Sequence, residues 1–243
     1  MKKISGVDGC KGGWLAFHFD GKIWSENHYK EISKLYSESN SKLILIDIPI
    51  GLRTTESSER LCDLESRKIL NKRKSSIFPA PSRLTIRCNE YRRALQKNKE
   101  ATGRGLSKQS FNIIPKIKEV DDLIQSVNYN PRNKRIREVH PEVCFWGLNE
   151  FSEMNYKKKS ALGICERMQV LGNYIKDVDK IFDQTRSRYY KTQVADDDII
   201  DALVCAVTAL FNGSLSTFPL APETDTKGIP MEIVYYQPAE KRI

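Results

Sequence analysis

A nearly continuous apolar run at residues 43–48, interrupted only by Asp47, constrains the fold of this 243-residue chain more than any other segment. A strand with one solvent-exposed face alternates apolar and polar residues, whereas a strand covered on both faces is apolar throughout. We therefore predict a buried parallel strand, ended by Pro49, which cannot donate a hydrogen bond to a neighbouring strand. Such a strand needs helices over its sheet, so the expected fold class is α/β.

The residues before this strand predict the rest of the sheet. Strands are expected at 4–8, 14–19 and 22–28, and a helix at 30–39. Asp20-Gly21 is a typical hairpin sequence between the second and third strands. Two hairpins followed by a helical crossover place three antiparallel strands beside a parallel centre. We therefore expect a mixed sheet.

The remainder of the chain predicts one enlarged domain spanning residues 1–243. Residues 53–134 form an inserted, basic and mainly helical segment, with helices near 58–71 and 116–127. A strand is expected at 135–145, a long helix at 160–182, and a last helix from Asp196 to Phe211. The tail beyond residue 214 contains proline and is expected on the surface.

The positive charge of the chain is concentrated in its middle. The whole sequence has a formal net charge of +9. Residues 53–137 contain 21 Lys and Arg against 9 Asp and Glu. This asymmetry favours a polyanionic partner, and we expect a nucleic acid. The alternative is a basic surface that contacts only solvent.

Cysteine spacing and hydropathy exclude several other classes. The six cysteines include no C-x-x-C pair, so a structural zinc site is not expected. The N-terminal residues have no apolar stretch long enough for a signal peptide. No window reaches the roughly 18 apolar residues of a membrane span. We expect a cytoplasmic protein that does not bind a membrane, and homodimerisation stays open.

Asp8 and Asp47 each follow the apolar part of a predicted strand. Ligands of open α/β sheets bind beyond the carboxyl ends of the strands. If the first and fourth strands are neighbours, the two carboxylates converge and repel each other unless a cation intervenes. Oxygen ligands without a cysteine pattern favour Mg²⁺ or Mn²⁺. The alternative for Asp8 is an ordinary Asp-Gly turn.

The last predicted helix begins with the sequence DDDIIDAL. Asp198 and Asp201 are three residues apart and share one helix face. Asp201 lies about one turn into the helix, beside its apolar residues. Both are therefore candidate metal ligands. The alternative, stronger for Asp198, is that acids at a helix start cap free N–H groups.

The segment REVHPE at 137–142 adds three polar side chains. Glu138, His140 and Glu142 alternate, so an extended chain points them to one face. Glu138 is expected to complete the metal site. His140 is expected to be a proton shuttle or a ligand, with a structural histidine as the alternative. Whether Glu138 or Glu142 is the fifth acid stays open, because Pro141 can bend the strand.

Several motifs occur together in one order along the chain. They are GVDGCKGGW at 6–14, IDIPIGL at 46–52, Arg60, Cys62, Asp63, Arg67, Arg73, SSIF at 75–78, Pro81, Arg83, EVHPEVCF at 138–145, Lys158, Lys159, Gly163, Arg167 and DDDIIDAL at 196–203. With these motifs, residues 4–210 resemble the bacterial and archaeal family catalogued as domain of unknown function 429, whose members are described as predicted ribonuclease H-like nucleases.

More broadly, the acids resemble those of the ribonuclease H superfamily of nucleases and resolvases, with an aspartate on the first strand, an acid on the fourth and one or two on a late helix. The resemblance implies a ribonuclease H-like mixed sheet flanked by helices. Two departures from resolvases of the RuvC type are Asp47, where a longer glutamate is usual, and the EVHPE segment, which has no clear equivalent there.

We hypothesise that the chain is a metal-dependent nuclease using a two-metal mechanism. Two cations roughly 3.5–4 Å apart would activate water and stabilise the leaving oxygen. Asp8 would bridge both ions, Asp47 and Glu138 would hold one, and Asp198 and Asp201 the other. His140 would handle protons. Phosphate contacts are expected from Lys11, Arg67, Arg73, Lys74, Arg83, Arg92 and Arg93.

Two other functions compete with this hypothesis. A phosphotransferase of the actin and sugar-kinase type shares the strand order and a similar first Asp-Gly loop. That class needs two lobes with a second phosphate loop, and Asp20-Gly21 reads better as a hairpin turn. The glycines around Lys11 also match phosphate-binding motifs poorly. The second competitor is a non-catalytic nucleic-acid-binding protein, in which the acids would hold no ion.

Overall fold

The computed structural model describes residues 3–127 and 135–238. Its strands are β1 (Ile4–Cys10), β2 (Gly13–Phe19), β3 (Trp24–Tyr29), β4 (Leu43–Ile46), β5 (Ile136–Glu138), β6 (Leu215–Thr224) and β7 (Pro230–Tyr236). The first five form one sheet in the order β3-β2-β1-β4-β5. β1 pairs antiparallel with β2 and parallel with β4, so the mixed sheet expected from the sequence is confirmed.

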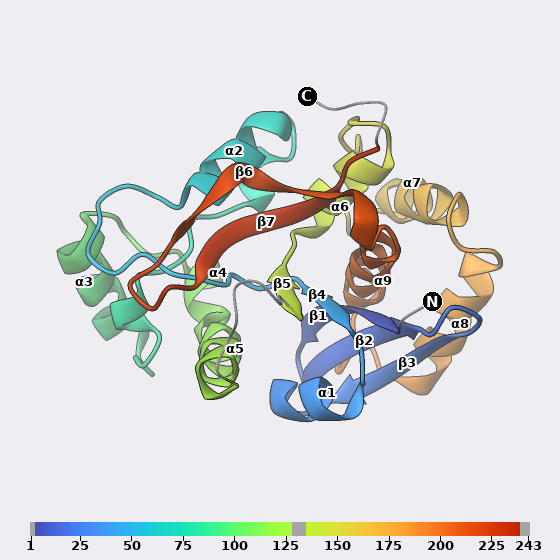
Figure 1. The fold of residues 1–243 in the computed structure, drawn as a ribbon, viewed down its shortest axis with the longest axis horizontal. Helices are drawn as coiled ribbons and strands as arrows, with labels where there is room; N and C mark the ends of the chain where they lie inside the picture. The colour runs from blue at the N-terminus through green and yellow to red at the C-terminus, as the bar shows by residue number, and fades with distance from the viewer. Residues whose placement is uncertain (1–2, 128–134, 239–243) are drawn as a thin grey trace.

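Helices cover both faces of this sheet. They are α1 (Ile32–Glu38), α2 (Leu61–Ile69), α3 (Tyr91–Thr102), α4 (Lys108–Asn112), α5 (Ile114–Ser126), α6 (Pro141–Leu148), α7 (Ala161–Gly172), α8 (Val178–Arg188) and α9 (Asp196–Leu210). In Figure 1, α9 and α1 lie on opposite sides of β1 and β2.

The alternating side chains of β4 explain its apolar run. Leu43 and Leu45 pack in a core shared with α9, whereas Ile44 and Ile46 pack in a second core shared with α1 and α5. Because successive strand residues point to opposite faces, a strand between two cores needs an apolar residue at every position. The prediction of a buried parallel strand is therefore confirmed.

The inserted segment is mainly helical, as expected. It contains α2, α3, α4 and α5, with short 3₁₀ turns at Lys74–Ser76 and Arg83–Thr85. The last residues of the predicted insertion, 128–134, lie outside the described part. α3 escaped prediction because it buries only Ala94, Asn98 and Thr102, which make no apolar stripe.

The C-terminal residues form a β-hairpin, so the expected surface tail is wrong. β6 and β7 pair antiparallel, and in Figure 1 they lie as a red and orange arch over the insertion and the sheet edge. Met231, Ile233 and Tyr235 of β7 pack with Cys62 of α2 and Trp146 of α6. The hairpin thereby joins the insertion to the rest of the molecule.

Two further predictions are corrected. The strand expected at 135–145 is only β5, because Pro141 occupies the first turn of α6, where its missing N–H leaves no hydrogen bond unmade. The helix expected at 160–182 is two helices. α7 ends at Gly172, and Asp177, with a left-handed φ of 58°, precedes α8.

Candidate active site

Asp8 and Asp47 lie side by side because β1 and β4 are parallel neighbours in register. Val7 pairs with Ile46, and the Asp47 N–H donates to the Val7 carbonyl at 3.0 Å. Asp8 lies inside β1 and accepts a hydrogen bond from the Gly9 N–H at 2.7 Å. The structure therefore places these two carboxylates close together, as predicted from the sequence.

A close approach between β1 and α9 brings the third acid to this place. A Cβ on Gly6 would lie 1.9 Å from the Ala206 backbone nitrogen, so only glycine allows the helix to pack this tightly. The first turns of α9 therefore reach the end of β1. Asp201 is 2% exposed and lines the same cavity as Asp8 and Asp47.

Burial and mutual repulsion disfavour full ionisation of this cluster. Burial raises the pKa of Asp8 well above its usual value, and Asp47, Asp201 and Asp198 raise it further. Burial and Asp201 raise the pKa of Asp47 to about 8. Burial also raises the pKa of Asp201, against the opposing charge of Lys158. Carboxylates arranged in this way need a cation before all of them can be charged.

Asp198 makes the contact of a helix-capping residue. Its Oδ2 accepts from the Ala195 N–H at 2.8 Å, as acids at helix starts do. The cavity lining includes Asp201 but not Asp198. Burial raises the pKa of Asp198 to about 6, although the Ala195 hydrogen bond opposes the shift. A role for Asp198 as a metal ligand stays a prediction.

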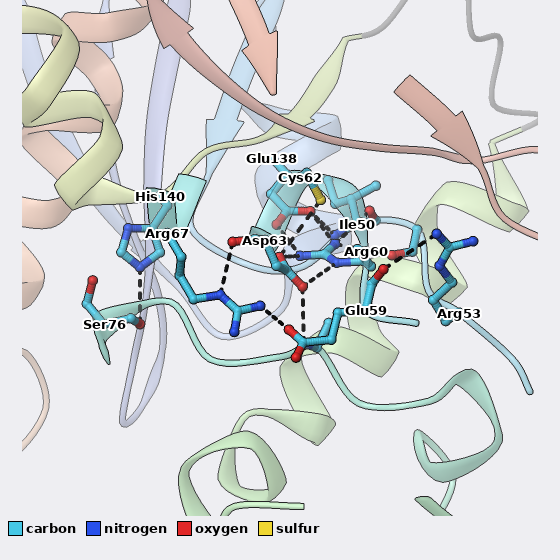
Figure 2. Close-up of polar contacts among 12 residues, drawn as sticks. Ile50, Arg53, Glu59, Arg60, Cys62, Asp63, Arg67, Ser76, Glu138 and His140 are labelled. Atoms are coloured by element: carbon cyan, nitrogen blue, oxygen red, sulfur yellow. Dashed lines mark hydrogen bonds and ion pairs between the residues drawn. The ribbon is translucent and has the colours of Figure 1, made fainter. Parts of the chain in front are cut away.

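Glu138 is held by a buried arginine (Figure 2). Both of its oxygens accept from Arg60, each at 2.8 Å, and Oε2 also accepts from the Ile50 N–H at 2.6 Å. Arg60 in turn binds Asp63 through two hydrogen bonds. Burial raises the pKa of Glu138 to about 7, against the effect of Arg60. Glu138 lines the cavity, and its ion pair with Arg60 competes with the binding of a metal ion.

His140 and Glu142 also line the cavity, but from the start of α6 and not from an extended strand. The extended chain expected through Glu142 is therefore wrong, because the helix begins at Pro141, although all three side chains line one cavity. His140 Nε2 lies 3.4 Å from the Ser76 carbonyl oxygen, as Figure 2 shows. Burial lowers the pKa of His140 to about 4, so its imidazole is neutral at pH 7.

Glu142 uses one oxygen and leaves the other without a partner. Its Oε1 accepts from Arg167 at 2.5 Å, while Oε2 is buried without a hydrogen-bond partner among the described residues. Burial raises the pKa of this carboxyl, against the charge of Arg167. Buried acceptors normally have partners, so this oxygen is a candidate ligand atom.

Two lysines in the cavity wall were missed at the sequence level. Lys158 Nζ lies 2.6 Å from Asp201 Oδ2 and 3.3 Å from Asp197 Oδ2. Lys116 Nζ donates to the Gly13 carbonyl and lies 4.1 Å from the centre of the Trp14 ring. Lys158 belongs to the family motifs, which could have indicated it. The apolar pattern of α5 gives no indication that Lys116 belongs to the site.

The cations predicted to contact phosphate lie elsewhere. None of the seven lines the cavity. Arg67 pairs with Glu59 (Figure 2), Arg73 donates to the Met154 carbonyl at 3.4 Å, and Arg83 binds Asp121 at 2.7 Å. The remaining four are exposed: Lys11, Lys74, Arg92 and Arg93. Phosphate contacts by all seven stay predictions.

The cavity has a volume of about 330 Å³. Its lining combines acids from the sheet and α9 with residues of the insertion, including Ser76, Phe78 and Ile113. Among residues 3–127 and 135–238, no group of three Asp, Glu, His or Cys side chains is already arranged to hold a metal ion. The ammonium of Lys158 is the cation that contacts Asp201. The oxygen-only donor set is nevertheless the type that Mg²⁺ and Mn²⁺ prefer.

No helix in the described part of the chain has the length and apolarity to cross a bilayer. The family model described as "Protein of unknown function (DUF429)" matches residues 6–224, and the chain therefore belongs to this family. No curated protein and no solved structure matches the chain.

Proposed function

We propose that this DUF429 protein is a metal-dependent phosphodiesterase that acts on nucleic acid and has a ribonuclease H-like sheet. The observation that carries the proposal is the meeting of Asp8, Asp47 and Asp201 in one cavity, although they come from three elements far apart in sequence. Burying like charges close together destabilises a protein. Their presence in one cavity therefore indicates a function that requires all three acids.

The strand order supports the ribonuclease H-like part of the proposal. The strands lie in the order β3-β2-β1-β4-β5. Asp8 is on β1, and Asp47 directly follows β4, the fourth strand along the chain. Asp201 is on the last helix, α9. An aspartate on the first strand, an acid at the fourth and an acid on a late helix are the arrangement expected from the resemblance to the ribonuclease H superfamily.

Asp8, Asp47 and Asp201 would hold Mg²⁺ or Mn²⁺, with Glu142 Oε2 as a further oxygen in the same cavity. A bound divalent ion would lower the pKa of water and stabilise charge on the phosphate and the leaving oxygen. Lys116 and Lys158 both line the cavity and can neutralise the charge of a phosphate. His140 enters the reaction as a neutral imidazole that can accept a proton once the negative charge of the bound phosphodiester raises its pKa.

Exposed cations outside the cavity are candidates for contacts with a polymer. Arg92 and Arg93 project from α3, and no ion pair joins either to another described residue. Lys11 and Lys74 are also exposed. Such side chains contact phosphates without the loss of an existing pair, whereas Arg67 and Arg83 would have to exchange partners.

The size of the cavity favours one second candidate. A volume of about 330 Å³ is at the lower end of small-ligand pockets and admits roughly one nucleotide. A hydrolase or phosphotransferase acting on a small phosphorylated molecule would use the same acids. Substrate choice separates the two functions.

A cleavage panel with Mn²⁺ tests the proposal. The substrates are labelled single-stranded RNA and DNA, duplexes, a four-way junction, ATP and a chromogenic phosphodiester. The proteins are the wild type, Asp8→Asn and Asp122→Asn, whose parent carboxylate is a half-exposed partner of Lys118. We expect cleavage of at least one polynucleotide, loss of about a hundredfold or more with Asp8→Asn, and no change with Asp122→Asn.

Turnover of ATP alone would favour the small-molecule candidate. Cleavage that persists at the wild-type rate in Asp8→Asn would remove the acid cavity from the chemistry. Polynucleotide binding without cleavage in any metal would leave the non-catalytic alternative.

A further inference from the structure

Lys158 places a positive charge inside the acid cavity. It lies in the loop between α6 and α7, and its Nζ is 2.6 Å from Asp201 Oδ2 and 3.3 Å from Asp197 Oδ2. Asp201 is a buried acid near the start of α9, so the ammonium reaches from the loop to the cavity wall. A metal ion bound directly to the same Asp201 oxygen would meet this ammonium.

The charge of Lys158 acts on the whole cluster. It lowers the pKa values of Asp8, Asp47 and Asp201, opposing the rise that burial causes. Burial alone would lower the pKa of Lys158, but Asp201 and Asp8 outweigh it and raise that pKa. At the observed distances, the ammonium is a counter-charge for Asp201 and Asp197.

The same cavity contains an oxygen that the lysine does not use. Glu142 is 5% exposed, and its Oε2 has no hydrogen-bond partner among the described residues. Glu142 and Lys158 both line the cavity. An ammonium paired with Asp201 thus leaves one buried carboxylate oxygen unsatisfied, which a divalent ion with six or more oxygen ligands can satisfy.

The lysine is also placed so that it can withdraw. Its side chain is 41% exposed, in contrast to the 3% of its partner Asp201. An ion pair with one half-exposed member is weaker than a buried pair, because water can replace the lost contact.

We propose that Lys158 is a displaceable counter-cation, which neutralises the acid cavity in the metal-free protein and yields its place on Asp201 to a divalent ion. The displaced ammonium stays at the cavity wall and binds a substrate phosphate, so metal loading and phosphate binding are coupled through one side chain. This inference rests on the proposed function, because it assumes that the acids bind a divalent ion.

Competition makes a measurable prediction about affinity. A metal ion that binds the wild type must break the Lys158–Asp201 pair, whereas in Lys158→Met it meets the acids directly. Lys159 provides a matched control, because its Nζ lies 3.5 Å from Asp197 Oδ2 and its side chain is 76% exposed. Lys159→Met removes the same formal charge from the neighbouring position without opening the Asp201 carboxylate.

The experiment is a titration of the metal-free full-length protein with MnCl₂, followed by calorimetry and by the paramagnetic resonance signal of free Mn²⁺. We expect Lys158→Met to bind Mn²⁺ about tenfold more tightly than the wild type, since an opposing charge at ion-pair distance is removed. Lys159→Met should stay within about twofold of the wild type, because exposed pairs contribute little. Lys158→Gln keeps a hydrogen-bond donor without the charge, and it should bind Mn²⁺ as tightly as Lys158→Met does. Agreement between the two variants would show that the change in affinity does not come from misfolding of one of them.

The outcomes separate this inference from the proposed function. Equal or weaker Mn²⁺ binding by both folded Lys158 variants, with clear binding by the wild type, would overturn the counter-cation and leave the metal site intact. An absence of Mn²⁺ binding by the wild type and by every variant would overturn both. Binding by the Lys158 variants alone would support the inference in its strongest form.

Discussion

At the residue scale, His18 is a buried histidine whose charge is coupled to folding. Its Nδ1 lies 2.6 Å from Ser5 Oγ and its Nε2 3.3 Å from the Tyr29 hydroxyl. Burial, with a smaller effect of Lys3, lowers its pKa to about 4. An unfolded histidine binds a proton near pH 6.5, so between pH 6.5 and 4 the unfolded state holds more protons than the folded state.

Stability should therefore fall as the pH is lowered through this window. Below pH 4, His18 lowers the free energy of unfolding by about 3 kcal/mol relative to pH 7. Each unit of pKa difference between the two states corresponds to about 1.4 kcal/mol. The sequence contains only three histidines, so an NMR titration can follow each ring. We expect the His18 ring to stay neutral down to about pH 5, and His18→Asn to lose less stability than the wild type between pH 7 and 4.5. Titration of His18 near its ordinary value would refute this account.

Whether a site residue could be predicted depends on the residues around it in the sequence. Asp8, Asp47 and Asp201 are recognisable because each interrupts or borders an apolar run, which makes a charge conspicuous. Arg60 and Lys158 stand in polar surroundings, where a charged residue is ordinary. Only the folded chain shows that Arg60 is 3% exposed between two carboxylates.

At the element scale, the contact between β1 and α9 determines whether the acids meet. Gly6→Ala would place a methyl group 1.9 Å from the Ala206 nitrogen and 2.5 Å from the Cys205 carbonyl carbon. Backbone atoms cannot move aside as a side chain can, so the helix would have to shift. We expect a loss of about 3 kcal/mol or more in the free energy of unfolding, at the upper end of overpacking effects.

The matched control is Gly213→Ala, where nothing lies within 4 Å of the added methyl group. Its effect should stay within about 0.5 kcal/mol. Urea unfolding of both variants makes the comparison. Because α9 carries Asp201, Gly6→Ala should also weaken Mn²⁺ binding in whatever fraction folds. Equal stability of the two variants would mean that the helix is not held by this contact.

The elements that were predicted correctly have strong local periodicity, and those that were not depend on distant partners. β4 is apolar throughout, and α9 is apolar beyond its first three residues except at Asp201 and Thr208. The interruption between α7 and α8 is hidden because Ile175 and Val178 continue the apolar spacing across it, and both are buried. β7 alternates Met231, Ile233 and Tyr235, but its position on α2 and α6 becomes evident only in three dimensions.

At the scale of the whole molecule, the basic insertion should make polynucleotide binding depend on salt. Each phosphate contact contributes about −0.9 to the slope of log affinity against log salt on duplex DNA, and about −0.7 on single strands. We expect Arg92→Ala combined with Arg93→Ala on exposed α3 positions to make the measured slope shallower by about 1.5. Fluorescence anisotropy of a labelled oligonucleotide between 50 and 300 mM KCl gives the slope.

A control with the same change in net charge is Lys34→Ala combined with Lys42→Ala, two exposed positions outside the insertion. This pair should leave the slope unchanged. Identical slopes for the two double variants would assign binding to net charge and not to α3.

The C-terminal hairpin also sets the order in which the molecule can be completed. Asp225, in the turn after β6, accepts from Arg83 and from the Leu52 N–H, and Ile233 of β7 lines the cavity. Asp8 and Asp47 leave the ribosome before Asp225 and Ile233, which come much later in the sequence. A growing chain therefore carries its acids without the walls that enclose them. Under the proposed activity, the nascent protein would gain its activity only once the hairpin had been synthesised and had closed the cavity.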